Sequence, residues 1–155
     1  MKFAIVALIA GVSAKSFPGF SALHAHCELK TTVSATCADT YTALDTTMNG
    51  WSASGDPSKG FYAPVQESSG TSVWFTRLTP AKKYTDDIIF DLIGTGSSCT
   101  VTSRSQSQAL SYYDYDTNFC NMYNVYRKSG LTFSAVSPSS CQWVPTDADT
   151  TCNKY

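Results

Sequence analysis

Six cysteines constrain this chain more than any other feature of its sequence. They are well separated along it: Cys27, Cys37, Cys99, Cys120, Cys141 and Cys152. An even set of cysteines in an exported chain is typical of a disulfide framework, whereas a zinc site needs closer Cys-x-x-Cys or His pairs. We therefore expect three disulfides, no free thiol and no metal site. Many pairings are open to six cysteines, and their spacing does not select one.

The N-terminal residues 1–14 have the pattern of an export signal. Lys2 gives a positive start, residues 3–12 are apolar, and Ser13-Ala14 supplies small residues of the kind that signal peptidases accept. The apolar run is shorter than the roughly 20 residues of a membrane-spanning helix, and no later segment approaches that length. We expect a secreted protein without a transmembrane segment.

The rest of the chain is expected to form one domain after a short arm. Residues 15–26 contain Pro and Gly but no acidic residue, which predicts a flexible N-terminal arm. Such a segment behind an export signal also leaves open transport into an alga-type plastid. Residues 27–155 then form a single disulfide-stapled domain, because a chain of 155 residues with 43% hydrophobic residues provides for one core.

The composition excludes some classes of partner. Charged residues make up only 15% of the chain, and 11 Lys and Arg stand against 12 Asp and Glu. Nucleic acids and anionic membranes are bound by basic stripes, which this balance does not supply, so we expect neither as a partner. Aromatic residues reach 13%, with nine Tyr. Tyr presented among Ser, Asn and Gln favours a surface for a neutral ligand.

Periodicity within the domain predicts an α+β fold. A first helix along residues 37–48 is expected to end at Asn49-Gly50, and a second, beginning after Asp116 or Thr117, is expected to end at Gly130. Apolar or alternating segments predict strands at residues 61–66, 73–78, 87–93, 99–107 and 131–136. In the third of these, alternation places Ile88, Phe90 and Leu92 on one face, which we expect to be buried. A short Gly-containing turn between the third and fourth of these indicates an antiparallel pair. We expect an antiparallel sheet of about four to six strands, packed with two helices and stapled by disulfides.

Four short motifs follow one another along the chain: Met48-Asn49-Gly50-Trp51, Asp86-Asp87, Val101-Thr102-Ser103-Arg104-Ser105, and Asp114 with Asn118. In this order they are similar to the family of uncharacterised proteins called DUF1499. That family shows an Asp-Asp pair opening a strand, a next strand ending in a Ser/Arg-rich run, and an Asp four residues before an Asn at a helix start. The resemblance spans roughly residues 40–127 of this sequence. It implies an α+β fold and transfers no catalytic residue.

The segment before the second helix is the main candidate for a binding site. It joins a strand to a helix, where sites are commonly built, and it combines aromatic with acidic side chains. One basic residue of the preceding strand, Arg104, is included among the candidates. The candidate ligand-binding residues are Arg104, Tyr112, Tyr113, Asp114, Tyr115, Asp116 and Asn118.

Other interpretations of this segment remain open. It is also a plain helix N-terminus, at which Asp116, Thr117 or Asn118 accepts backbone N–H groups. Its Asp-x-Asp-x-Asn order matches the start of an EF-hand loop. That loop requires Gly and Glu, however, where this chain has Phe119 and Val125. An EF-hand is therefore excluded, and a weaker calcium site stays an alternative.

Charged side chains on the expected strands have structural interpretations too. Asp86 and Asp87 suggest an acid–base pair, but neighbours on a strand point to opposite faces. We therefore favour a solvated turn followed by an inward or paired Asp. Arg104 is expected to form an ion pair with Asp87 or Asp91 across the sheet.

The sequence assigns no catalytic residue and no cofactor. The two histidines, His24 and His26, stand in the expected arm, where they serve poorly as a general base. We expect a non-enzymatic binding module for a neutral ligand, which is a glycan, a lipid or a protein. The alternatives are a small secreted hydrolase using Asp87 or Asp114 with Arg104, and a structural protein of an extracellular matrix or wall.

Overall fold

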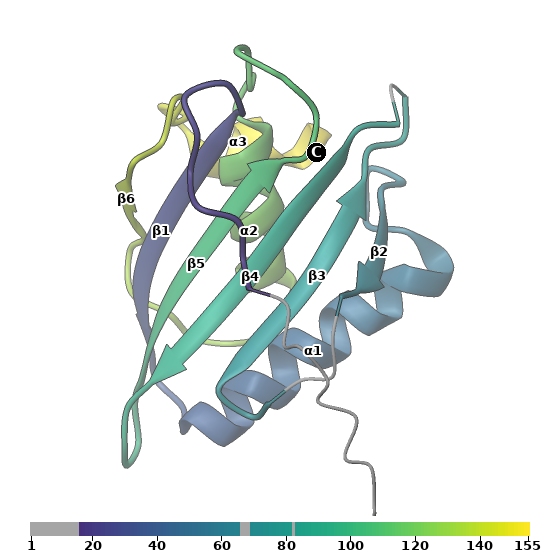
Figure 1. Ribbon diagram of the computed structural model, residues 1–155. Coiled ribbons are helices and arrows are strands. Elements are labelled where there is room, and N and C mark those ends of the chain that lie inside the picture. The colour runs from purple at the N-terminus through teal and green to yellow at the C-terminus, as the bar shows by residue number, and fades with distance from the viewer. Residues whose placement is uncertain (1–15, 66–68, 82) are drawn as a thin grey trace, which may run out of the picture.

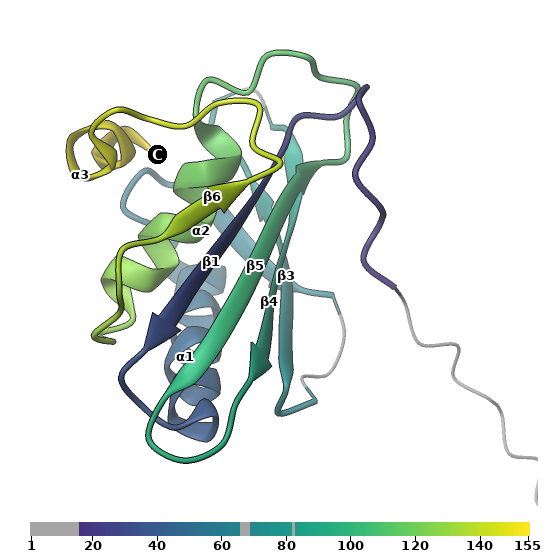
Figure 2. The same ribbon diagram turned by 90° about the vertical axis from the view of Figure 1, so that its left-hand side faces the viewer.

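The computed structural model describes residues 16–65, 69–81 and 83–155. The export signal expected in residues 1–14 lies outside the described residues. Within them, an antiparallel sheet in the strand order β2-β3-β4-β5-β1-β6 carries helices α1 and α2 on one face (Figures 1 and 2). In chain order the elements are β1 (His26–Val33), α1 (Cys37–Ser54), β2 (Phe61–Pro64), β3 (Ser72–Leu78), β4 (Thr85–Ile93), β5 (Cys99–Ser107), α2 (Thr117–Lys128), β6 (Ser137–Ser139), α3 (Ala148–Thr151) and a final 3₁₀ turn (Cys152–Lys154). The predicted α+β class is confirmed.

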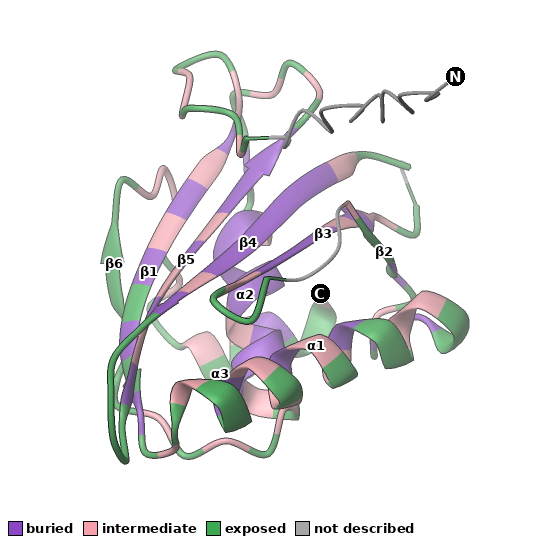
Figure 3. Cartoon of the chain, turned by 60° about the horizontal axis from the view of Figure 1, so that its bottom comes forward, coloured by how far each residue is buried: buried purple, intermediate pink, exposed green. Residues whose placement is uncertain are grey.

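The core lies between the sheet and its two long helices. The alternation predicted for β4 is confirmed, since Ile88, Phe90 and Leu92 are buried on the helix-facing side. Phe90 meets Tyr126 of α2 edge-on, with ring centroids 5.4 Å apart. Figure 3 shows the result: strands β3 to β5 are mostly buried, whereas the outer side of α1 is exposed. Within the described residues, no helix has the length and apolar character needed to cross a bilayer.

Helix α1 is longer than predicted. Thr36 caps it, its side chain accepting the backbone N–H of Asp39 at 3.1 Å. It does not end at Asn49-Gly50 but continues to Ser54. The extra turn packs Trp51 against Tyr62 of β2, with ring centroids 5.0 Å apart, and this contact outweighs the weak helix preference of Asn and Gly.

The two strands at the β6 edge of the sheet also differ from the sequence prediction. The prediction of a strand over residues 131–136 is wrong. Of these residues only Phe133 forms a β-bridge, to Val33, and its ring packs against Tyr126. The strand in this region is β6, which pairs with β1. Strand β1 was not predicted, and it begins at His26, the last residue of the expected arm.

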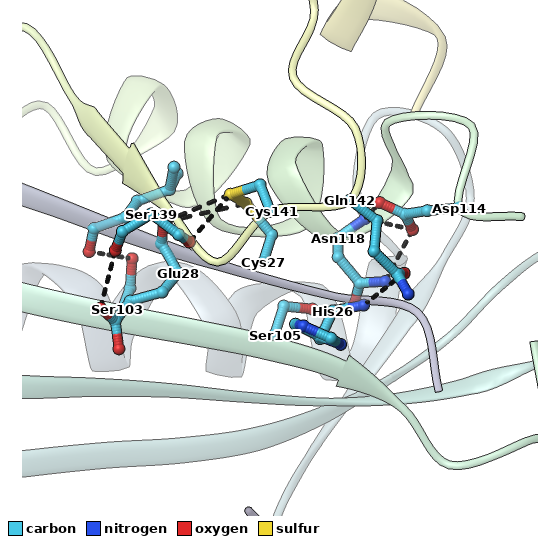
Figure 4. Close-up of a disulfide and its surroundings, with 11 residues drawn as sticks. His26, Cys27, Glu28, Ser103, Ser105, Asp114, Asn118, Ser139, Cys141 and Gln142 are labelled. Atoms are coloured by element: carbon cyan, nitrogen blue, oxygen red, sulfur yellow. Dashed lines mark hydrogen bonds between the residues drawn. A yellow bond between two sulfur atoms is a disulfide. The ribbon is translucent and has the colours of Figure 1, made fainter. Parts of the chain in front are cut away.

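The three expected disulfides are formed, and they use all six cysteines. Their pairs are Cys27–Cys141, Cys37–Cys99 and Cys120–Cys152. The first ties β1 to the segment after β6 (Figure 4), the second ties the start of α1 to the start of β5, and the third ties α2 to the C-terminal turn. Each bond therefore joins elements that are far apart in the sequence.

The first described residues, 16–25, cross the sheet face that carries no helix (Figure 2). Phe17 lies against Trp74 of β3, with ring centroids 5.7 Å apart. The guanidinium of Arg104 lies 4.8 Å from the centre of the same Phe17 ring. This segment thus covers part of the outer face of the sheet.

Candidate functional site

A pocket of about 630 Å³ opens at one end of the sheet. The end of β3, the start of β4 and the end of β5 meet there, because Arg77 pairs with Asp86 and Asp86 pairs with Ser107 in the strand register. Paired residues in an antiparallel sheet direct their side chains to the same face. The row Arg77–Asp86–Ser107 therefore lines one wall, and the loop before α2 supplies the opposite side.

Arg77 is buried in the pocket wall by a loop that follows α1. Its Nε donates to Asp56 Oδ2 at 2.6 Å, and its Nη2 donates to Ser58 Oγ at 2.7 Å. The other oxygen of Asp56 accepts the backbone N–H groups of Ser58 and Gly60. Arg77 and Asp56 are only 2% and 3% exposed, so this ion pair is sealed from solvent.

Asp86 brings a second buried carboxyl to the pocket. Its Oδ2 accepts a hydrogen bond from Nδ2 of Asn121 on α2 at 2.9 Å. Burial raises the pKa of Asp86, while the Asn121 hydrogen bond and the charge of Arg77 oppose that rise. The expected solvated turn at this position is wrong, because both Asp86 and Asp87 are buried within β4. As expected for strand neighbours, Asp87 points to the other face, where it accepts from Nε1 of Trp74.

Asp114 contributes a third buried carboxyl, from the loop before α2. Its Oδ1 accepts the backbone N–H of Asn118 at 3.0 Å and the side-chain Nδ2 of Asn118 at 2.6 Å. Burial raises the pKa of Asp114 to about 7, against the lowering effect of these hydrogen bonds. The hydrogen bonds continue from Asn118 to Ser105, whose hydroxyl donates to Asn118 Oδ1. Figure 4 shows where these three side chains lie.

These contacts correct the expected helix cap. Asp116 occupies the N-cap position of α2 in a left-handed conformation (φ 67°), and its side chain makes no capping hydrogen bond. Asp114, two residues earlier, accepts the backbone N–H instead. The side chain of Asp114 therefore turns inward to line the pocket, and it also accepts hydrogen bonds from the first turn of α2.

Tyrosines form the rim of the pocket. Tyr112, Tyr113 and Tyr115 are 67%, 63% and 65% exposed, yet they contact one another. Tyr113 is central: it meets Tyr112 edge-on, stacks on Tyr115 at 5.9 Å, and lies 6.0 Å from Trp143. Tyr84 and Tyr155 also line the pocket. The hydroxyl of Tyr155 donates to the backbone carbonyl of Tyr115 and so ties the C-terminal turn to the loop.

The structure brings most of the predicted site residues together. Five of the seven line the pocket: Tyr112, Tyr113, Asp114, Tyr115 and Asn118. Asp116 stands in the same loop but does not line it. Arg104 lies on the opposite sheet face, where Nη2 donates to Asp91 Oδ2 at 2.7 Å. The ion pair expected for Arg104 is thus formed, and this residue stands apart from the pocket.

Sequence reasoning missed the basic residue of the site and its partner. Arg77 is the only charged residue of β3, and its position on a mostly apolar strand was an available signal of burial with a partner. No comparable signal marked Asp56, which reaches Arg77 through a loop. Among the described residues, no cluster of three or more His, Cys, Asp and Glu side chains is placed to hold a metal ion.

No protein-family model matches this chain, and no curated protein matches it. The resemblance to the DUF1499 family stays a prediction. Roles for the pocket residues rest on their geometry and chemistry.

Proposed function

We propose that the protein is a non-enzymatic binding module that takes up a neutral, hydroxyl-rich ligand, a glycan, in the tyrosine-rimmed pocket. The observation that carries this proposal is a floor of buried hydrogen-bonding groups beneath a rim of exposed aromatic rings. The apolar face of a sugar ring packs on aromatic side chains, while its hydroxyls bond to carboxyl and amide groups. Asp86, Asp114 and Asn118 offer such groups.

A glycan fits this pocket better than the other neutral ligands considered. An acyl chain reaching the floor would bury Asp86 and Asp114 against hydrocarbon, which is costly for polar groups. A protein partner would need a broad contact surface, whereas the tyrosines surround a cavity of about 630 Å³, within the usual range for small-molecule sites. The three disulfides support a secreted protein, since such bonds persist in oxidising compartments.

A glycan array probed with the wild-type protein tests this proposal. We expect binding to a defined set of glycans, and loss of that binding in Tyr113→Ala with the melting temperature unchanged. Leu110→Ala is the matched control, because Leu110 is 77% exposed in the same loop and does not line the pocket. A wild-type protein that binds no glycan, or equal losses in both variants, would contradict the proposal.

A hydrolase is the second candidate, favoured by one observation. Asp86 and Asp114 both have raised pKa values in one pocket, and a carboxyl with a raised pKa can act as a general acid near neutral pH. Asp87 and Arg104 have no part in it, because they lie on the other sheet face. Release of reducing ends from array-positive glycans, abolished in Asp114→Asn, is the expected outcome for an enzyme.

A further inference from the structure

The buried charges of the pocket are out of balance. Three carboxyls are buried there, at 3% to 4% exposure, and one guanidinium. Asp56 pairs with Arg77 at 2.6 Å and neutralises it. Asp86 and Asp114 are left with amide and hydroxyl partners, and among the described residues neither of them forms a salt bridge.

The other ionisable groups near these two carboxyls do not compensate them. Lys154, on the C-terminal turn, is exposed at the rim with its Nζ 5.2 Å from the ring centre of Tyr155. Asp116 adds a further negative charge beside Asp114, and Tyr62 of β2 faces Arg77. From β5 and α2 the neighbours are uncharged: Ser105, Ser107, Asn118 and Asn121.

We propose that the ligand unit that reaches the pocket floor carries a protonated amine, held between the carboxyls of Asp86 and Asp114. This inference rests on the proposed glycan binding in the same pocket and changes it in one respect: the sugar is not neutral but an amino sugar with a free, protonated amine. An ammonium group presents three donors and no acceptor, and it supplies the positive charge that the two carboxyls lack. Hydroxyls supply donors without that charge.

The rim supports the same class of ligand. Cations bind to the faces of aromatic rings, and Tyr112, Tyr113 and Tyr115 surround the entrance. Burial raises the pKa values of Asp86 and Asp114, and at Asp86 the charge of Arg77 offsets only part of that rise. A bound ammonium would lower both pKa values, so ligand binding and carboxyl ionisation favour each other.

Calorimetric titration of the wild-type protein with two sets of sugars tests this inference. Glucosamine oligosaccharides with free amines are compared at pH 6.5 with their N-acetylated forms of the same length. We expect the free-amine forms to bind about tenfold more tightly or better, the effect of a hydrogen bond between charged groups. Equal affinity for the two sets, or preference for the acetylated set, overturns the inference and leaves glycan binding standing. Binding of neither set overturns the inference, and glycan binding as such is then decided by the array.

Variants of the two carboxyls test whether these residues cause the preference for the free amine. Asp114→Asn and Asp86→Asn keep the shape of the side chain and remove its charge. Each is expected to lose the preference for the amine while still binding the acetylated oligosaccharide. Asp87→Asn is the matched control, because Asp87 is buried in the same strand but faces the other side of the sheet. A preference that survives in both Asp114→Asn and Asp86→Asn overturns the inference without depending on how stable the variants are.

Discussion

The backbone of Gly60 lies directly against the guanidinium of Arg77: a Cβ atom on Gly60 would be 2.7 Å from Cζ. The loop from Asp56 to Gly60 therefore closes over Arg77 only because residue 60 has no side chain. The same loop holds the Asp56 carboxylate against Nε. Loop and arginine form one unit, which fixes the wall of the pocket.

Gly60→Ala is expected to destabilise the protein by about 1–3 kcal/mol, the usual cost of overpacking a buried contact. The methyl group displaces either the loop or Arg77, and both movements weaken the Asp56 ion pair. Urea unfolding measures the change. Gly50→Ala is the matched control, since a Cβ there meets nothing within 4 Å and Ala favours the helix by up to about 1 kcal/mol. Similar effects of the two substitutions would contradict this account of Gly60.

Asp114 is expected to make the stability of the protein depend on pH. Its pKa is about 7 in the folded chain and near 3.8 when unfolded, so between these values the folded state holds a proton that the unfolded state has lost. Stability from this group is therefore present below pH 4 and falls as the pH rises through 7. Relative to Asp114→Asn, the wild type should lose on the order of 2–4 kcal/mol between pH 4 and pH 7.

Urea unfolding of both proteins at several pH values measures this difference. Asn keeps an oxygen that accepts the backbone N–H of Asn118, so the helix start is preserved in the variant. Contributions from Asp86 are common to the two proteins and cancel in the comparison to first order. Curves of stability against pH that run parallel would contradict the raised pKa of Asp114.

Phe90→Ala is expected to cost about 3–5 kcal/mol, because it removes a fully buried ring between the sheet and α2. Ile93→Ala, on the same strand but 74% exposed, should change stability by less than about 0.5 kcal/mol. Thermal or urea unfolding of both variants gives the comparison. A small loss for Phe90→Ala would show that the core tolerates an emptied site there.

Exported protein is expected to begin near Lys15 and to carry no free thiol. Intact-mass analysis before and after alkylation, without reduction, measures both. All six cysteines are paired in the structure, so no alkyl group should be added until a reductant is present. Uptake of alkylating reagent by the unreduced protein would contradict this arrangement, and a mass that includes residues 1–14 would contradict the export signal.

Patterns within short segments of the sequence predicted the features that depend on neighbouring residues alone. The alternation around Phe90 identified the buried face of β4, and the aromatic and acidic run from Tyr112 to Asn118 identified one side of the pocket. Gly50 misled the prediction, because the helix passes through it to bury Trp51. Tertiary packing of that kind is invisible in local propensity.

The other side of the pocket depends on long-range pairing. Arg77, Asp86 and Ser107 meet only through the register of three strands, and Asp56 joins them through a loop. Hydrophobic periodicity carries no information on register between strands far apart in the chain. Arg104 illustrates the same limit: it stands three positions before Ser107 on β5, and the alternation of the strand sends the two side chains to opposite faces.

The bond between Cys27 and Cys141 makes most of this protein a closed covalent ring. A protease that cuts one peptide bond anywhere between these two residues leaves both products attached through sulfur. The exposed tyrosine loop, which is an accessible target, lies inside this ring. A molecule cut there would migrate as a single species on a non-reducing gel and separate into two only after reduction, so a cut in this loop would not by itself release either part of the chain.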